Sequence, residues 1–175
     1  MPHILITGAS RRLGLYLTEQ FLQRRWQVTT LSRAPSAELR ALDGPLLTNI
    51  ACDYQDSGQI AAICAPLQQA PLDAVVHNAS LFLPDSQCVD TDRYQQMFAV
   101  HMQLPALLNR LLAAQLAQSD NGNIIHMTDI YADNPLPNHS LYCSTKAGLA
   151  NLNKSVAQQL APKVRVNAIA PGAMA

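Results

Sequence analysis

The sequence predicts an α/β fold in which helices cover both faces of one doubly wound parallel sheet. Short runs of consecutive apolar residues alternate along the 175 residues with longer amphipathic segments. Strands that are apolar throughout are typical of a parallel sheet covered on both faces. Hydrophobic residues make up 49% of the chain and charged residues 14%, which suits one large buried core. Because no linker-like segment interrupts the pattern, residues 1–175 are expected to form one domain.

The individual elements follow from these runs in chain order. The residues HILIT form the first apolar run, and Leu13, Leu17 and Phe21 then recur at helical spacing. Asn121-Gly122 interrupts the chain after the longest helical segment. Strands are expected at residues 3–7, 26–32, 46–52, 72–77, 123–128 and 163–170. Helices are expected at residues 12–25, 36–42, 56–69, 91–117 and 139–161. Right-handed crossovers between parallel strands then give the doubly wound sheet.

Charge and composition argue against several classes of partner. The 12 Lys and Arg residues balance the 12 Asp and Glu residues, and no basic run suits nucleic acid or an anionic membrane. No apolar stretch is long enough for a transmembrane helix, and the N-terminus lacks the regions of a signal peptide. The four cysteines are widely spaced, which indicates free thiols in a reducing cytoplasm. The five histidines have no metal-ligand spacing, so no metal is expected.

A glycine-containing turn joins the first strand to the first helix, with the sequence TGASRRLG over residues 7–14. Gly8 allows a tight turn off the strand, and Gly14 allows the helix to approach the sheet or a cofactor closely. The helix N-terminus then offers free N–H groups and the positive end of its dipole to a pyrophosphate. The turn therefore indicates a nucleotide site. The alternative is an ordinary strand–helix turn whose glycines serve only its geometry.

Tyr142 and Lys146 form a candidate proton-donating pair in the sequence YCSTK, with Asp129 thirteen positions before the tyrosine. Residues four apart on a helix share a face. A nearby ammonium favours the phenolate, so we expect the pKa of Tyr142 to be lowered towards neutrality. Such a group donates a proton at physiological pH. The alternative is a solvated pair on a helix surface.

The end of the second expected strand, Leu31-Ser32-Arg33, indicates a phosphorylated cofactor. Folds that bind NAD place a carboxylate here to hold the ribose 2′-hydroxyl, and this chain has none. Ser32 can donate a hydrogen bond to a 2′-phosphate, and Arg33 can pair with it through two bonds. Arg11 lies in the turn that faces the same region. NADPH is therefore the expected cofactor, and the alternative is that these arginines are surface cations.

Four motifs in order resemble the short-chain dehydrogenase/reductase family over essentially the whole chain. They are the turn at residues 7–14, Asn78-Ala79, Tyr142 with Lys146, and NAIAPG at residues 167–172. The resemblance implies an NADP-binding Rossmann fold in which Asp53 meets the adenine ring. Together with the residues argued above, it assigns the cofactor to Gly8, Ser10, Arg11, Arg12, Leu13, Gly14, Ser32, Arg33, Asp53, Asn78, Ala79, Ser80, Tyr142, Lys146, Pro171 and Gly172.

Three departures from the common family pattern resemble its pteridine reductases, including the bacterial dihydromonapterin reductases. Arg12 replaces the middle glycine of the turn, Ser80 and then Phe82 follow Asn-Ala, and Asp129 replaces the usual serine. The resemblance implies that Phe82 stacks on a pterin. It implies a catalytic set of Asp129, Tyr142 and Lys146. It implies substrate contacts at Arg12, Ser80, Phe82, Asp129 and Tyr142.

The aspartate also makes chemical sense for a C=N substrate. A carbonyl reductase needs a hydroxyl donor beside its developing oxyanion, which a carboxylate would repel. Reduction of C=N instead requires a proton on nitrogen, and a carboxyl can relay one through Tyr142 or water. We therefore expect NADPH to reduce a dihydropterin of the monapterin, biopterin or folate type, with hydride to C6 and a proton to N5. The alternatives are a 3-oxoacyl or sugar carbonyl reductase and a non-catalytic NADPH-binding protein.

Several of these assignments have a purely structural alternative. For Asp129 it is a cap on the following turn, and for Phe82 it is packing alone. For Arg12 it is contact with phosphate only. His101 occupies the place where the family often has a water-binding asparagine, and its alternative is a buried histidine bonded to the backbone.

The resemblance also implies an assembly and a further C-terminal part. The helices at 91–117 and 139–161 match those that the family packs by two-fold symmetry, and the stretch 104–116 is more apolar than one sheet face needs. A homotetramer is expected, with a dimer as the alternative. The sequence ends at Ala175, whereas the family continues with a substrate-covering lid and a seventh strand. This sheet is therefore expected to lack that strand and that lid.

Overall fold

The structure is a computed structural model that describes residues 1–86 and 90–172. Within these residues, six parallel strands form one sheet in the order β3-β2-β1-β4-β5-β6. The strands are β1 (His3–Thr7), β2 (Gln27–Ser32), β3 (Leu47–Ala51), β4 (Ala74–His77), β5 (Asn123–Met127) and β6 (Arg165–Ile169). The predicted doubly wound fold is confirmed. The strand order reverses between β1 and β4, and a ligand of such a fold binds where the loops diverge at this point.

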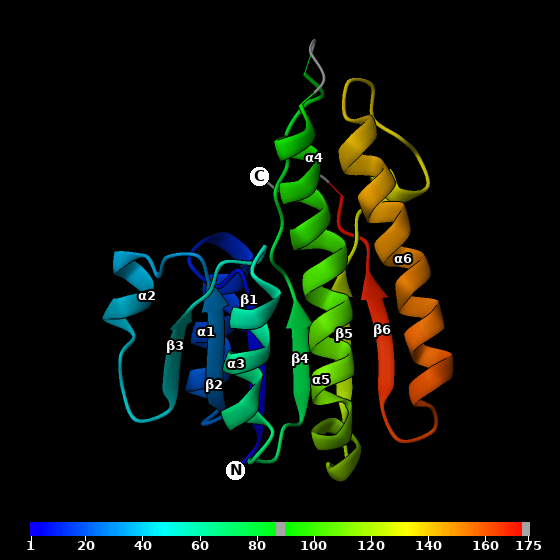
Figure 1. The fold of residues 1–175 in the computed structure, drawn as a ribbon. Coiled ribbons are helices and arrows are strands. Elements are labelled where there is room, and N and C mark those ends of the chain that lie inside the picture. Colours follow the sequence, from blue (N-terminus) through cyan, green and yellow to red (C-terminus); the bar gives the residue numbers. More distant parts are fainter. Residues whose placement is uncertain (87–89, 173–175) are drawn as a thin grey trace.

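Helices cover both faces of this sheet (Figure 1). They are α1 (Arg12–Gln23), α2 (Ala37–Ala41), α3 (Ser57–Leu67), α4 (Thr91–Phe98), α5 (Leu104–Gln118) and α6 (Ser140–Leu160). One buried cluster joins the sheet to α3, α5 and α6, and it includes Ile60, Leu108 and Val156 from these three helices. A second cluster joins the other face to α1 and α2. Both faces of the sheet are therefore buried, as its apolar strands require.

The helix expected at residues 91–117 is interrupted by a π-helical segment, η1 (Ala99–Gln103). Pro105 stands in the first turn of α5 and has no N–H to offer the carbonyl of His101, four residues earlier. The wider turn of a π segment accommodates this missing bond. Sequence periodicity does not reveal the interruption, because apolar residues continue on both sides of it.

The other expected boundaries differ from the structure by a few residues at most. Helix α1 ends at Gln23, and Arg25 adopts a left-handed φ of 58° before β2 begins. A short 3-10 helix, η2 (Ile130–Ala132), follows β5. No helix within residues 1–86 and 90–172 is both long and apolar enough to cross a membrane.

Candidate active site

Gly8 and Gly14 allow the turn after β1 to pack against the segment after β4. Gly8 has a φ of 68°, and a Cβ on it would lie 2.6 Å from the Cα of Ala79. A Cβ on Gly14 would overlap the carbonyl oxygen of Gly8 and would lie 2.6 Å from the side-chain nitrogen of Asn78. Real side chains do not tolerate such distances, so both positions require glycine.

Hydrogen bonds lock this turn to the Asn-Ala segment. The Asn78 side-chain amide donates to the carbonyls of Thr7 at 3.1 Å and Gly8 at 3.0 Å. The Thr7 hydroxyl oxygen accepts from the N–H groups of Asn78 at 3.1 Å and Ala79 at 3.0 Å. The turn after β1 and the segment after β4 are therefore held together by four hydrogen bonds at the point where the strand order reverses.

The N-terminus of α1 has the properties of an anion site. Within the described part of the chain, no side chain caps it, whereas Ser36, Asp56 and Asp90 cap α2, α3 and α4. Its first N–H groups and the positive end of its dipole are thus left for a ligand such as pyrophosphate. Arg11 and Arg12 are exposed beside it. Arg12, which replaces the middle glycine of the family pattern, takes a φ of 50°.

A cleft of about 390 Å³ lies at the carboxyl edge of the sheet. It is lined by Arg33, Asp53, Tyr54, Gln55, Leu81, Gln96 and Val100. Arg33 and Asp53 are predicted cofactor residues. The sequence carried no motif for Leu81, Gln96 and Val100, which come from the loop after β4, from α4 and from η1. Their place in the cleft depends on how these segments pack against the loop after β3.

The residues between the turn and the cleft include one polar group that is left for a ligand. The buried hydroxyl of Ser32 has no hydrogen-bond partner among the described residues, so it remains free to donate to a ligand. Ser10 donates to the Ala34 carbonyl at 2.7 Å and so ties the turn to the loop that carries Arg33. Leu13, which is half-buried, packs with the α1 face of the sheet.

Asp129 contacts two parts of the site at once. One carboxylate oxygen accepts from the N–H of Tyr131 at 2.9 Å and so caps η2. The other accepts from the Tyr142 hydroxyl at 2.6 Å. The cap that the structural alternative expects is therefore present, and it fixes the carboxylate that faces the phenol.

The expected effect of Lys146 on Tyr142 is wrong. Burial raises the pKa of Tyr142, and the hydrogen bond to Asp129 raises it further. The Lys146 ammonium lies over the phenol ring, 5.8 Å from its centre, and donates to the carbonyl of Met127 at 2.8 Å. Burial lowers the pKa of Lys146 to about 8, although Asp129 opposes this. Tyr142 is therefore a neutral phenol at physiological pH, hydrogen-bonded to a carboxyl group.

Phe82 forms an aromatic wall next to this pair. Its ring stacks on His139 with centres 4.5 Å apart and planes 12° apart. It meets Tyr142 at 4.8 Å and 90°, and it is 52% exposed. The structure thus brings a flat apolar surface, open to solvent, to the side of the Tyr142 phenol.

The buried His101 side chain, on η1, hydrogen-bonds to the loop after β4 and to α6. Its Nε2 accepts from the N–H of Leu81 at 3.2 Å and lies 3.0 Å from the Ser80 hydroxyl. Since Nε2 accepts, Nδ1 carries the proton and donates to the Thr145 hydroxyl at 2.8 Å. Thr145 in turn donates to the carbonyl of Tyr142 at 2.7 Å. Burial lowers the pKa of His101 to about 3, so the ring stays neutral.

These contacts match part of the structural alternative stated for His101, because the ring is buried and accepts one backbone N–H, while its other two partners are side-chain hydroxyls. Both ring nitrogens are engaged by protein atoms, which gives the ring a positioning role. Thr145 is a residue of the site that the sequence analysis missed, because its hydroxyl becomes relevant only through the bond to His101.

The remaining predicted residues lie near the site or outside the described residues. Pro171 lies beside the residue after Asp129, since the Ile130 N–H donates to the Pro171 carbonyl at 3.3 Å, and Gly172 follows it. Cys88 falls outside the described residues, while Cys52, Cys64 and Cys143 are buried free thiols. Within residues 1–86 and 90–172, no three His, Cys, Asp or Glu side chains gather as a metal site.

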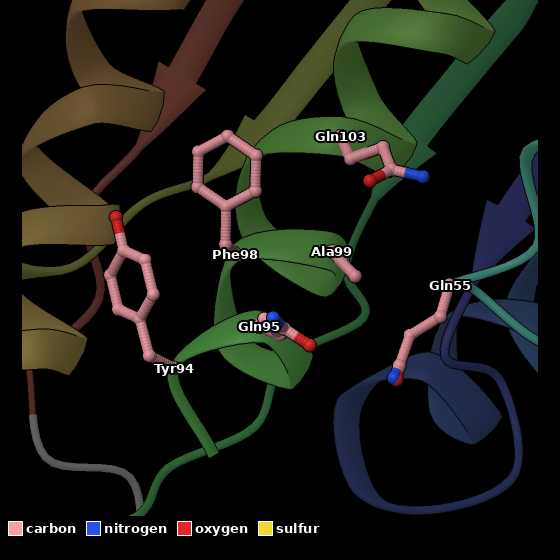
Figure 2. A pocket seen from close by; sticks show the side chains of 6 residues that line it. All are labelled: Gln55, Tyr94, Gln95, Phe98, Ala99 and Gln103. Carbon is pink, nitrogen blue, oxygen red and sulfur yellow. The ribbon is translucent and has the colours of Figure 1, made fainter. Parts of the chain in front are cut away.

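A second hollow of about 230 Å³ lies between the loop after β3 and the segment formed by α4 and η1. Figure 2 shows Gln55 on one side of it and the side chains of α4 and η1 on the other. Tyr94 and Phe98 are 43% and 42% exposed there, with ring centres 6.2 Å apart. None of the predicted cofactor or substrate residues lines this hollow.

Sequence and structure comparisons agree with this geometry. Residues 2–175 match the sequence model of the short chain dehydrogenase family. The chain is 35% identical over 173 residues to a dihydromonapterin reductase of Klebsiella pneumoniae and 34% identical to one of Enterobacter. In both cases the match covers 96% of this chain and 72% of the relative.

Solved structures show the same fold. A short-chain dehydrogenase of Streptomyces avermitilis superposes with a TM-score of 0.91 at 23% identity, covering 100% of this chain and 68% of that one. The FolM alternative dihydrofolate reductase 1 of Brucella canis, solved with NADP, gives 0.82 at 26% identity, covering 98% and 73%. The family match over nearly the whole chain places this protein in the short-chain dehydrogenase family of oxidoreductases, which use nicotinamide cofactors.

Proposed function

We propose that this protein reduces a dihydropterin to its tetrahydro form with NADPH, adding hydride to C6 and a proton to N5. The observation that carries the proposal is the bond of 2.6 Å between Asp129 and Tyr142. This carboxylate occupies the position where the family usually has a serine. It suits protonation of a nitrogen better than stabilisation of an oxyanion. The names of the relatives, dihydromonapterin reductase and dihydrofolate reductase, support the same chemistry.

Tyr142 holds the proton that the reaction needs. Its raised pKa keeps the phenol protonated at neutral pH, and Asp129 orients the hydroxyl. N5 takes this proton as C6 receives the hydride, which the reduced nicotinamide supplies when it is bound. Asp129 is only partly buried, so the pair regains a proton from water.

Lys146 supports this step without touching the phenol oxygen. One of its three N–H donors is held by the Met127 carbonyl, which leaves two for the ribose of the nicotinamide half. Phe82 offers its exposed ring for stacking on the pterin, and Arg12 lies at the phosphate side of the same site. We propose these three roles from the positions of the residues.

The preference for NADPH over NADH rests on the end of β2. Arg33 lies in the cleft, Ser32 has a free hydroxyl among the described residues, and no carboxylate follows the strand directly. A carboxylate is the group that binds the 2′-hydroxyl of NAD. The Brucella structure, which contains NADP, is consistent with this preference.

Exchanging Asp129 for serine tests the proposal. Asp129→Ser should lower dihydropterin turnover and leave NADPH affinity nearly unchanged, because the carboxylate faces the phenol and not the cofactor cleft. A steady-state rate with dihydropterin and a binding titration with NADPH measure the two effects. Full dihydropterin activity in this variant would favour the carbonyl-reductase alternative. An unmodified protein that binds NADPH but reduces neither substrate would favour the non-catalytic alternative.

We also propose that residues 1–175 act as an NADP-binding domain in a cytoplasmic homotetramer. The three described cysteines are free and buried, which suits a reducing compartment. The leucines of α5 at residues 104, 108, 112 and 116 are buried in this chain's own core, and Leu107 and Leu111 pack partly buried against it, so much of the apolar stretch on α5 serves this chain's own fold. The exposed pair Tyr94 and Phe98 on α4 also supports the assembly.

A further inference from the structure

The segment after the Asn-Ala-Ser element, residues 81–85, is fixed to α6 through Asp85. One Asp85 carboxylate oxygen accepts from both the N–H and the hydroxyl of Ser140, each at 2.8 Å. The other accepts from the N–H of Leu141 at 3.2 Å. The Asp85 N–H donates to the Asn138 carbonyl at 2.7 Å. Asp85 therefore bonds both sides of the start of α6.

The Asp85 carboxylate caps the N-terminus of α6, whereas α2, α3 and α4 are capped by the residue at their own N-cap position. The residue at the N-cap position, His139, makes no side-chain cap bond, and Asp85 supplies the acceptor from 55 positions earlier in the chain. A carboxylate at a helix N-terminus also interacts favourably with the helix dipole. The bonds from Ser140 hold the pKa of Asp85 below its usual range.

The position of Asp85 matters because its hydrogen bonds join two segments that each carry a residue of the site. Phe82 lies three residues before it, and Tyr142 lies two residues after Ser140. The Phe82 ring already rests on His139 at 4.5 Å and against Tyr142 at 4.8 Å. Without the Asp85 bonds, the Phe82 ring and the first turn of α6 could move apart.

The same segment is held on its other side by α4. The Arg93 guanidinium donates to the Pro84 carbonyl at 2.8 Å and pairs with Asp90 at 3.2 Å. His101 holds the start of the segment through the N–H of Leu81. Residues 81–85, which include Phe82, are therefore held by hydrogen bonds to η1, α4 and α6. Asp85 makes the bonds to α6, the helix that carries Tyr142.

We propose that Asp85 is a positioning residue that holds the Phe82 ring against the Tyr142 ring and thereby shapes the surface on which the flat substrate stacks. The substrate part of this inference rests on the proposed dihydropterin reduction. Asp85 itself touches no reacting atom. A small misplacement of the groups that hold a substrate is costly, since 1 Å is associated with losses on the order of 100-fold.

The test compares Asp85→Ala and Asp85→Asn with Asp56→Ala, a matched variant that removes the cap of α3. Asp85→Ala should reduce kcat/KM for the dihydropterin by about 10- to 100-fold and leave NADPH affinity unchanged. Asp85→Asn keeps one oxygen acceptor and should recover part of this loss. Asp56→Ala should lower thermal stability without changing the dihydropterin KM. A stability loss in Asp85→Ala equal to that of Asp56→Ala, with kcat/KM unchanged, would overturn the proposal.

Fluorine NMR provides a readout that needs no substrate. The chain has three phenylalanines, so protein labelled with fluorophenylalanine gives few signals, and Phe82→Leu identifies the one from the wall. Asp85→Ala should shift this signal towards that of a free ring, whereas Asp56→Ala should not move it. An unmoved signal would overturn the positioning role. A shifted signal in a protein whose unmodified form does not reduce dihydropterins would support that role and contradict the proposed function.

Discussion

At the scale of single residues, the chemistry of the site depends on which surroundings set the pKa of each titratable group. Tyr142 responds to burial and to Asp129, and Lys146 responds to burial first. The sequence predicted that these three residues belong together, but it could not show that Lys146 turns towards the Met127 carbonyl. Helical spacing fixes the face of a residue, and the direction of a long flexible side chain depends on tertiary contacts.

The lowered pKa of Lys146 predicts a pH dependence of cofactor binding. Its pKa falls to about 8 in the folded protein, so the ammonium is present at neutral pH and is lost as the pH rises through about 8. If the charged group holds the cofactor ribose, NADPH affinity should fall over that range. Titrations of NADPH binding against pH measure the effect.

Lys146→Arg provides the matched control, because a guanidinium remains charged at these pH values. Its NADPH affinity should show no fall over the range in which Lys146 loses its proton, whatever its absolute value. The same fall in both proteins would assign the titration to another group.

Folding stability gives an independent check with a defined sign. The folded pKa of Lys146 lies below its ordinary value of 10.5, so the unfolded chain binds the proton more tightly. The free energy of unfolding should therefore increase as the pH rises from about 8 towards that ordinary value, for the contribution of this residue.

At the scale of elements, the glycine turn and the strand order were predictable, and the π segment was not. Gly8 and Gly14 follow an apolar strand and precede a helical pattern, which is enough to place the turn. The break at η1 depends on Pro105 and on the hydrogen bonds of His101. Periodicity does not reveal it, and neither does it reveal Asp85, whose bonds join segments 55 residues apart.

The turn predicts that Gly14→Ala disrupts both packing and cofactor binding. The added methyl group would overlap the Gly8 carbonyl oxygen and would lie 2.6 Å from the Asn78 side chain. Forced overpacking of this kind typically costs about 1–3 kcal/mol. Urea unfolding and an NADPH titration measure the two consequences.

Gly44→Ala is the matched substitution at an open position, where the nearest heavy atom to the new methyl group lies at 3.9 Å. It should leave stability and NADPH affinity almost unchanged. Equal effects of the two substitutions would show that the close approach at Gly14 has no special importance.

At the scale of the whole molecule, the exposed aromatic pair on α4 predicts association between copies. Phe98 is 42% exposed next to Tyr94, and large exposed apolar side chains that adjoin one another favour an interface. Light scattering at micromolar concentration should give the mass of a tetramer, and Phe98→Ser should lower it. Tyr16→Ser removes another exposed aromatic, on α1, and should not change the mass. A monomeric mass for the unmodified protein would contradict the prediction.

The central claim is that this site reduces a dihydropterin, and the rate of NADPH oxidation tests it most directly. The unmodified protein should oxidise NADPH quickly with a 7,8-dihydropterin and far more slowly with a β-ketoester or a simple ketone. Tyr142→Phe should reduce the dihydropterin rate by about 100- to 10,000-fold, the usual contribution of a general acid. A preference for the β-ketoester, or a Tyr142→Phe variant that keeps the full dihydropterin rate, would contradict the account.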